Sequence, residues 1–284
     1  MRTKLHTVRR RPWRLGALAA ASALALAGCS ADQLATGYLP SKPGLTDKTE
    51  SIINLWNGAW IAGLAVGVLV WGLIIWSIIV YRKRKDDHEL PVQLQYHIPL
   101  ELMYTIIPVI MVGVLFYNTV RVTDNLWDTS GEADTHISVY GKQWSWDFNY
   151  LDEGVYYSGD RITLTGKEGD RDKLPILYLP VNETVEFQLH SRDVQHSFWI
   201  PAFLTKLDMV PGELRVFHVT PQETGTFVGK CAELCGEYHA EMLFQVKVVE
   251  RDEYDAAMQE LRDAGNVGER GEEFDRTYTP GGTY

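Results

Sequence analysis

The sequence predicts two membrane-spanning helices followed by an all-β domain, and three observations support this prediction. Two long apolar runs, residues 51–81 and 102–120, contain no charged side chain, and a strongly basic loop separates them. From about residue 131 onward, apolar side chains instead recur at every second position. About 20 apolar residues span a bilayer as a helix, whereas a period of two is typical of strands that bury one face.

A short apolar run near the N-terminus is interpreted as part of an export signal. Arg9, Arg10, Arg11 and Arg14 form a basic region, and residues 15–26 form an apolar run too short to span a bilayer. The run ends in Leu26-Ala27-Gly28-Cys29, which resembles the bacterial lipobox. We therefore expect residues 1–28 to be a signal peptide, cleaved before a Cys29 that then carries lipid. An ordinary signal peptide with a chance cysteine is the alternative.

The two spans define the expected topology. The first, over residues 51–81, ends at Arg82-Lys83-Arg84-Lys85, and such a basic cluster marks the cytoplasmic side. A cytoplasmic loop over 82–97 then leads to the second span over 98–120. Residues 29–50 and everything after residue 120, and hence both termini, should be extracytoplasmic in a bacterial cell membrane. Glu101 lies at the cytoplasmic start of the second span, where it is either an interfacial residue or part of a proton path.

The remainder of the chain predicts short strands. Clear alternation occurs over 144–150, 185–190 and 244–248, and further strands are expected over 135–140, 214–219 and 224–229. Strands without intervening helices favour an antiparallel sandwich or barrel. Residues 160–173 should form an exposed charged loop. Residues 251–264 should form an amphipathic helix, and a loose tail should follow to residue 284.

The charge of the chain is uneven and restricts its partners. Residues 1–120 hold 12 Lys/Arg and 7 Asp/Glu, a net charge of +5, whereas residues 121–284 hold 15 Lys/Arg and 30 Asp/Glu, a net charge of −15. The acidic part should repel nucleic acid and attract a basic protein surface, so we expect no nucleic-acid partner. An acidic surface kept only for solubility has the same composition.

Four potential metal ligands lie within one short stretch: Cys231, Cys235, His239 and Met242. Thiolate and thioether sulfurs favour copper, and a structural zinc site has little use for methionine. Two cysteines four residues apart also suit a disulfide or thiol exchange, but neither role needs the histidine or the methionine. His196 could add a ligand from elsewhere, although a lone histidine among apolar residues is usually a core residue.

Taken together, the motifs resemble subunit II of haem–copper cytochrome c oxidases over nearly the whole chain after the signal. The matching motifs are Gly141-x-Gln143-Trp144-x-Trp146, Asp193-Val194-x-His196-Ser197, Lys206-x-Asp208-x-x-Pro211-Gly212 and Cys231-x-Glu233-x-Cys235-Gly236-x-x-His239-x-x-Met242. The resemblance implies a cupredoxin-like Greek-key sandwich over residues 121–250. It also implies the electron-accepting subunit of a respiratory enzyme that reduces oxygen to water and translocates protons.

The resemblance further implies a binuclear copper A centre with a defined ligand set. Cys231 and Cys235 would bridge both coppers, and His196 and His239 would bind one copper each. Met242 and the Glu233 carbonyl would complete the two sites. The Glu233 side chain would face a magnesium or manganese ion shared with subunit I.

Two further residues gain roles from the resemblance. Trp144 would be the surface point at which electrons enter from a c-type cytochrome, and Glu101 would lie at the mouth of a proton channel into subunit I. Asp193 is a candidate for donor docking, but Arg192 precedes it where many relatives carry a second acid. Together with the charged 160–173 insertion and the lipid anchor, this leaves open whether the donor is soluble or membrane-bound.

Other classes of protein explain less of the sequence. A membrane-tethered copper chaperone or thiol oxidoreductase would need a thioredoxin-like βαβ pattern around the cysteines, and the strands lack intervening helices. Nitrous oxide reductase shares the copper loop without the membrane hairpin. A quinol oxidase subunit keeps the fold but lacks the copper ligands. A structural lipoprotein would explain only the anchor.

Overall fold

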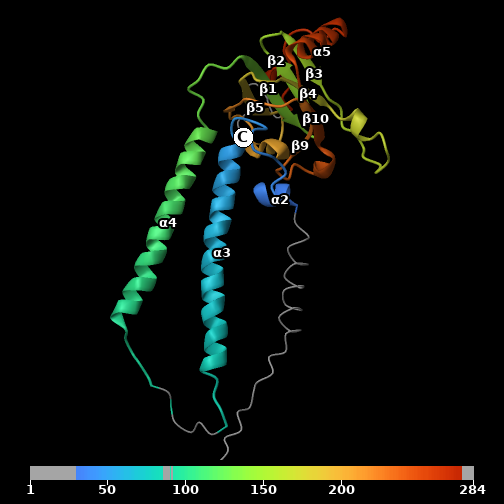
Figure 1. Cartoon of the computed structure of the whole chain (residues 1–284). Helices are drawn as coiled ribbons and strands as arrows, with labels where there is room; N and C mark the ends of the chain where they lie inside the picture. Colours follow the sequence, from blue (N-terminus) through green and yellow to red (C-terminus); the bar gives the residue numbers. More distant parts are fainter. Residues whose placement is uncertain (1–29, 86–89, 91, 277–284) are drawn as a thin grey trace, which may run out of the picture.

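Two long helices and a β domain make up most of the chain. A computed structural model gives the structure of residues 30–85, 90 and 92–276. Helices α3 (Thr49–Val80) and α4 (Ile98–Leu126) leave the β domain in the same direction (Figure 1). Both are long and apolar enough to cross a membrane. The expected signal peptide over 1–28 and the lipidation site Cys29 lie outside the described residues.

The second helix continues past the end expected from hydropathy. The sequence ends the span at residue 120, but α4 runs on to Leu126. The added turns contain Arg121, Asp124 and Asn125, which are polar without breaking a helix. Hydropathy locates the apolar part of such a helix and cannot locate its water-exposed end.

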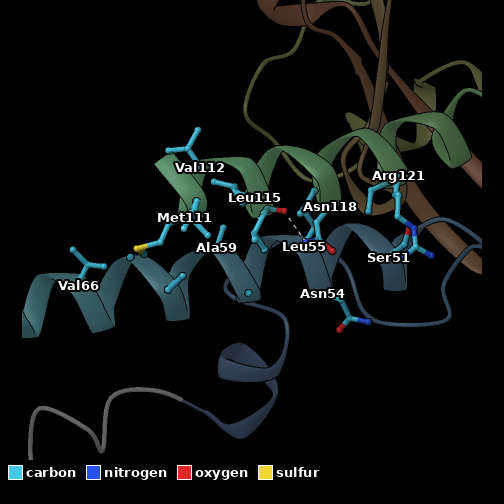
Figure 2. A pocket seen from close by; sticks show the side chains of 16 residues that line it. Ser51, Asn54, Leu55, Ala59, Val66, Met111, Val112, Leu115, Asn118 and Arg121 are labelled. Carbon is cyan, nitrogen blue, oxygen red and sulfur yellow. Dashed lines mark hydrogen bonds between the residues drawn. The ribbon is translucent and has the colours of Figure 1, made fainter. Parts of the chain in front are cut away.

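A groove of about 1060 Å³ separates the two helices (Figure 2). Its lining is mainly apolar and includes Gly58, Ala59 and Leu115, with Arg121 near Ser51 at the end closer to the β domain. The groove contains none of the candidate metal ligands. The candidate metal ligands all lie in the β domain instead.

The segment before α3 fastens the helices to the β domain. Asp47 and Thr220 exchange two hydrogen bonds, of 3.1 Å between the Asp47 amide and the Thr220 carbonyl and 2.9 Å between the Thr220 amide and the Asp47 carboxylate. Lys48 Nζ donates to the Asn125 carbonyl near the end of α4 at 2.9 Å. Short helix α2 (Ala31–Ala35) precedes this segment. Residues 30–48 thus lie on the same side of the spans as the β domain, as the expected topology requires.

The β domain consists of two five-stranded sheets. One has the order β3-β2-β1-β5-β8 and the other the order β4-β10-β9-β6-β7. The first sheet contains β1 (Thr135–Lys142), β2 (Ser145–Tyr150), β3 (Val155–Ser158), β5 (Val185–Ser191) and β8 (Arg215–Val219). The second contains β4 (Ile176–Pro180), β6 (His196–Ile200), β7 (Thr205–Met209), β9 (Gly225–Cys231) and β10 (Leu243–Val249). The predicted β-sandwich is confirmed, and its fold is cupredoxin-like.

The sheets are mixed, whereas the sequence predicts antiparallel pairing throughout. Strands β1 and β5 pair in parallel, as do β4 and β10. Strands β3, β4, β6 and β7 were also not predicted. Each has only four or five residues, which is too short for a clear alternation to stand out from the loops around it.

Aromatic side chains fill the space between the sheets. Phe198 stacks on Phe244 with ring centroids 5.1 Å apart, and Trp146 lies edge-on to Phe244 at 5.0 Å. Each of these side chains is at most 1% exposed. Burying such a ring contributes roughly 1.5–3 kcal/mol, so this cluster is a major part of the stability of the domain.

Strand β2 is buried on both faces, which its alternating sequence does not predict. Trp146, Phe148 and Tyr150 face the core as expected, but Asp147 and Asn149 are only 0% and 1% exposed. The chain that follows α5 (Arg251–Asp263) covers them. Asn149 and the Arg270 backbone exchange two hydrogen bonds, of 3.0 and 3.1 Å. We name residues 266–276 the C-terminal segment; the expectation of a loose tail is wrong for these residues.

A buried ion pair joins β2 to the C-terminal segment. Arg192, which is 1% exposed, donates to Asp147 at 2.7 Å and to the carbonyls of Arg270 and Gly271 at 2.7 and 2.8 Å. Burial alone would raise the pKa of Asp147. The Lys142 ammonium, the Ser158 hydroxyl and Arg192 outweigh that effect and hold this pKa below its usual range.

We expect Asp147→Asn to destabilise the chain by about 3–5 kcal/mol, because it removes the buried carboxylate that Arg192 and Lys142 share. The wild-type carboxylate has a lowered pKa, so its contribution is complete above about pH 4 and is lost as the pH falls further. The variant should lack this acid-dependent loss. Thermal and urea unfolding of the full chain in detergent measures both effects.

The matched control is Asp255→Asn, which removes an exposed carboxylate 3.6 Å from Arg251 on α5. It should change the unfolding free energy by less than about 0.5 kcal/mol. An Asp147→Asn protein as stable as this control would show that the buried pair contributes nothing.

Candidate metal centre

The ligand loop connects two neighbouring strands of the second sheet. Strand β9 ends at Cys231 and β10 begins at Leu243. The Cys231 amide donates to the Met242 carbonyl at 3.0 Å, which closes the loop at its base. Residue His196 begins β6, which pairs with β9 through Phe198 and Cys231. The sheet therefore brings a histidine that is distant in sequence to the two cysteines.

All the ligands expected from the sequence converge on one point. The sulfurs of Cys231 and Cys235 are 3.9 Å apart. Nδ1 of His196 lies 3.8 Å from the Cys231 sulfur, and Nδ1 of His239 lies 3.6 Å from the Cys235 sulfur. The Met242 sulfur is 3.7 Å from that of Cys235, and the Glu233 carbonyl oxygen is 3.2 Å from that of Cys231. Six donor atoms thus surround one small volume.

This donor set fits copper and argues against a disulfide. Both cysteines are free and buried, and their sulfurs are far beyond the bond length of about 2.0 Å. Two thiols, two imidazoles and a thioether match the preference of copper for soft sulfur and imidazole ligands. Structural zinc sites use four Cys or His ligands and leave no role for Met242.

The pKa values of the two thiols are shifted in opposite directions. A hydrogen bond from Cys235 lowers the pKa of Cys231, and one from the His196 imidazole acts in the same direction. The same pairing, together with burial, raises the pKa of Cys235. Cys231 is therefore prepared as a thiolate, the form that binds metal. Binding of copper would release the remaining proton.

His196 is oriented by Asp193. The imidazole is completely buried, and its Nε2 lies 2.8 Å from the Asp193 carboxylate. This contact leaves Nδ1 facing Cys231, and a carboxylate behind a histidine is a common support for metal ligands. Asp193 is itself 7% exposed and also accepts the Gln143 amide at 2.8 Å. The sequence suggested Asp193 for donor docking; its geometry favours orienting His196, a role visible only once the fold places the two together.

Two glycines give the site its close packing. A Cβ atom on Gly141 would lie 3.0–3.1 Å from the His196 ring. Gly236 has a φ of +127° in the ligand loop, and a Cβ there would lie 3.1 Å from the Trp144 ring. L side chains rarely adopt this φ, so both the backbone and the contact require glycine.

Trp144 lies in a turn and not on the strand that the sequence predicts. Lys142 pairs with Ser145, so Gln143 and Trp144 form the two-residue connection between β1 and β2. Trp144 therefore does not share the core face of Trp146. Its half-buried ring lies edge-on to Tyr238 of the ligand loop, with centroids 4.9 Å apart. Gln143 Nε2 donates to the Cys235 carbonyl at 2.7 Å, which ties the turn to the site.

Glu101 is in the first turn of α4, and Figure 1 shows that this helix begins at its end away from the β domain. Its carboxylate accepts the His97 amide at 2.9 Å. This bond caps the helix N-terminus, where a carboxylate is favourable. Capping is thus a structural role for Glu101, whatever other role it has.

Comparisons with known proteins show which family the chain resembles. A family model described as "Cytochrome C oxidase subunit II, periplasmic domain" matches residues 135–249. The "Probable cytochrome c oxidase subunit 2" of Streptomyces coelicolor is 40% identical over 291 residues, which cover 91% of each chain. The "Cytochrome c oxidase subunit 2" of Mycobacterium tuberculosis is 35% identical over 298 residues, covering 88% of this chain and 81% of that one.

A solved structure is also similar to the β domain. It is the periplasmic domain of subunit II of cytochrome oxidase from Bradyrhizobium japonicum, with 33% sequence identity and a TM-score of 0.42. The match covers 47% of this chain and 97% of that one.

We expect Gly141→Ala to displace the His196 ring and weaken copper binding by about 10–100-fold, the usual effect of disturbing a metal ligand's support. Competition with a copper chelator, followed by absorption spectroscopy, measures the affinity. Gly131→Ala is the control, because a Cβ there meets nothing within 4 Å. Equal affinities for the two variants would contradict the inferred contact.

Proposed function

This chain belongs to the cytochrome c oxidase subunit 2 family, and on that premise we propose that it accepts electrons from a c-type cytochrome at a binuclear copper A centre. As subunit II of a haem–copper oxidase, it would pass them to the haem of subunit I. Reduction of oxygen to water and translocation of protons would follow there.

The main support for this proposal is that six potential copper ligand atoms lie close together. Two coppers would be held by the side chains of Cys231, Cys235, His196, His239 and Met242 and by the Glu233 carbonyl. The bound coppers would supply a one-electron acceptor. The chain's own residues hold the ligands in fixed positions: Asp193 orients His196, and the Cys231–Met242 hydrogen bond closes the loop. Fixed ligands reduce the rearrangement that each electron transfer requires.

Glu233 offers a second metal-binding group. Its carbonyl faces Cys231, whereas no hydrogen bond or ion pair engages its carboxylate among the described residues. Carboxylates are the ligands that magnesium and manganese prefer. We assign this carboxylate to a magnesium or manganese ion shared with subunit I.

Trp144 is proposed as the point at which electrons enter. It contacts the ligand loop through Tyr238 and Gly236, so its ring bridges the surface and the metal site. The donor is a c-type cytochrome, either soluble or membrane-bound. The net acidic charge of residues 121–284 would steer a basic donor toward the domain.

The membrane topology supports the same function. The chain is a membrane protein with an extracytoplasmic domain. We propose that both termini are extracytoplasmic, that residues 1–28 are removed and that Cys29 is lipidated; mass spectrometry of the mature N-terminus tests this. Glu101 would then lie at the cytoplasmic side, where we propose that it admits protons to subunit I.

The purified full chain should bind two coppers, with an electron paramagnetic resonance signal shared by both. Cys231→Ser or Cys235→Ser should abolish that signal, because each removes a bridging ligand. Met242→Leu should keep copper but change the reduction potential. Cys29→Ser serves as the control and should leave the metal content unchanged. One copper per chain, or zinc in the native protein, would refute the binuclear centre.

Trp144→Phe should keep both coppers and slow reduction by the cytochrome by orders of magnitude, as stopped-flow absorption can measure. Trp146→Phe is the matched control: it replaces a buried indole by a smaller ring and leaves a cavity, so it should cost about 1–3 kcal/mol of stability while reduction stays fast. Rising salt should slow reduction by a soluble donor and matter less for a tethered one. Normal reduction of the Trp144 variant would exclude this route.

Glu101→Gln should slow turnover of the assembled oxidase without changing copper content or reduction by the donor. Glutamine keeps an oxygen to accept the His97 amide, so the helix cap is preserved. Glu50→Gln, in the first turn of α3, is the control and should turn over normally. Oxygen consumption measures both, and equal rates would leave Glu101 with its capping role alone.

A further inference from the structure

We propose that the C-terminal segment positions and tunes the metal centre through Arg276. This inference rests on the proposed copper function and assigns a role to a segment outside the motifs that indicate it. Three sets of contacts support it: those that fix the segment to the sheet, those that fix its last described residues to Arg192, and those from Arg276 to the site.

The first set fixes the segment along the edge of β3 and the outer face of β2. The Tyr156 amide donates to the Asn266 carbonyl at 3.1 Å, and the Gly268 amide donates to the Gly154 carbonyl at 2.8 Å. Asn149 then holds the backbone of Arg270 through two hydrogen bonds. The segment therefore follows a defined path across the sheet.

The second set of contacts joins the end of the C-terminal segment to Arg192, which lies four residues before His196 in the sequence. Arg192 contacts the carbonyls of Arg270 and Gly271 and lies 3.1 Å from the Asp275 carboxylate. The Arg276 amide in turn donates to the Arg192 carbonyl at 2.8 Å. Asp193 follows Arg192 directly. This bond therefore places the Arg276 side chain close to the Asp193 carboxylate, which orients His196.

The third set joins Arg276 to both halves of the site. Its Nη1 donates to the Gln143 carbonyl at 2.9 Å and lies 3.7 Å from the Asp193 carboxylate. Asp193 contacts His196, and Gln143 contacts the Cys235 carbonyl. The Arg276 guanidinium thus contacts both Asp193, which orients His196, and the turn that contains Trp144.

The charge of Arg276 has a predictable effect on the centre. The Asp193 carboxylate makes the His196 imidazole more electron-rich and so favours the oxidised metal. Arg276 opposes this effect, since a positive charge stabilises an added electron. Its side chain is 55% exposed, so solvent weakens the effect without removing it. Arg276 is therefore a positioning residue that raises the reduction potential.

The test uses the full chain in detergent, loaded with copper. Arg276→Gln should lower the reduction potential, shifting the electron-transfer equilibrium about two- to fivefold toward the oxidised form. Arg276→Lys keeps the charge and should stay near the wild-type potential. Arg262→Gln, which removes a cation bonded to the Glu153 carbonyl, is the control.

Redox titration and thermal melting together decide the outcome. An unchanged potential in Arg276→Gln overturns the inference. A fall in melting temperature beyond that of Arg262→Gln, with or without a change in potential, also overturns it, because Arg276 would then support the fold. If the wild-type chain binds no copper, the proposed function fails instead, and the copper content distinguishes the two failures.

Discussion

The buried guanidinium of Arg192 is the constraint on which the described β domain depends. An unpaired charge inside a protein is costly, so its donors must all find partners. Those partners include Asp147 on β2, the Asp275 carboxylate and the backbone of residues 270 and 271, and its Cζ lies 3.9 Å from the centre of the Tyr140 ring on β1. Only the folded sheet with its C-terminal segment in place supplies them. Since Asp193 is the next residue, the same requirement fixes the support of His196.

The metal ligands themselves are placed by ordinary sheet geometry. His196 and Cys231 lie at the ends of two hydrogen-bonded strands, and the loop from Cys231 returns to pair its base with Met242. Beneath them, Phe198 and Phe244 pack face to face. A rigid apolar layer under a short closed loop leaves the ligands little freedom. This is the condition that a centre exchanging electrons without large rearrangement requires.

The sequence predicts what depends on local pattern. The spans follow from runs of apolar residues, and the ligands from Cys231 to Met242 lie close together in the chain. What it misses depends on distant partners. Asp147 and Asn149 read as outward-facing because nothing nearby shows that Arg192 and Arg270 will cover them. Trp144 continues the alternation of β2, yet the Lys142–Ser145 pair places it in the turn. The contact between Asp193 and His196 is local, since three positions separate them, but it depends on the conformation of the turn after β5.

The bonds of Asp47 and Lys48 have a mechanical consequence. They join the start of α3 to the Thr220 turn of the domain and to Asn125 at the end of α4, so both spans and the sandwich meet at one junction. A domain attached to the helices through a single flexible contact would be free to change its orientation. With both helices and the Thr220 turn joined at the same place, the sandwich cannot rotate about either helix without breaking these bonds.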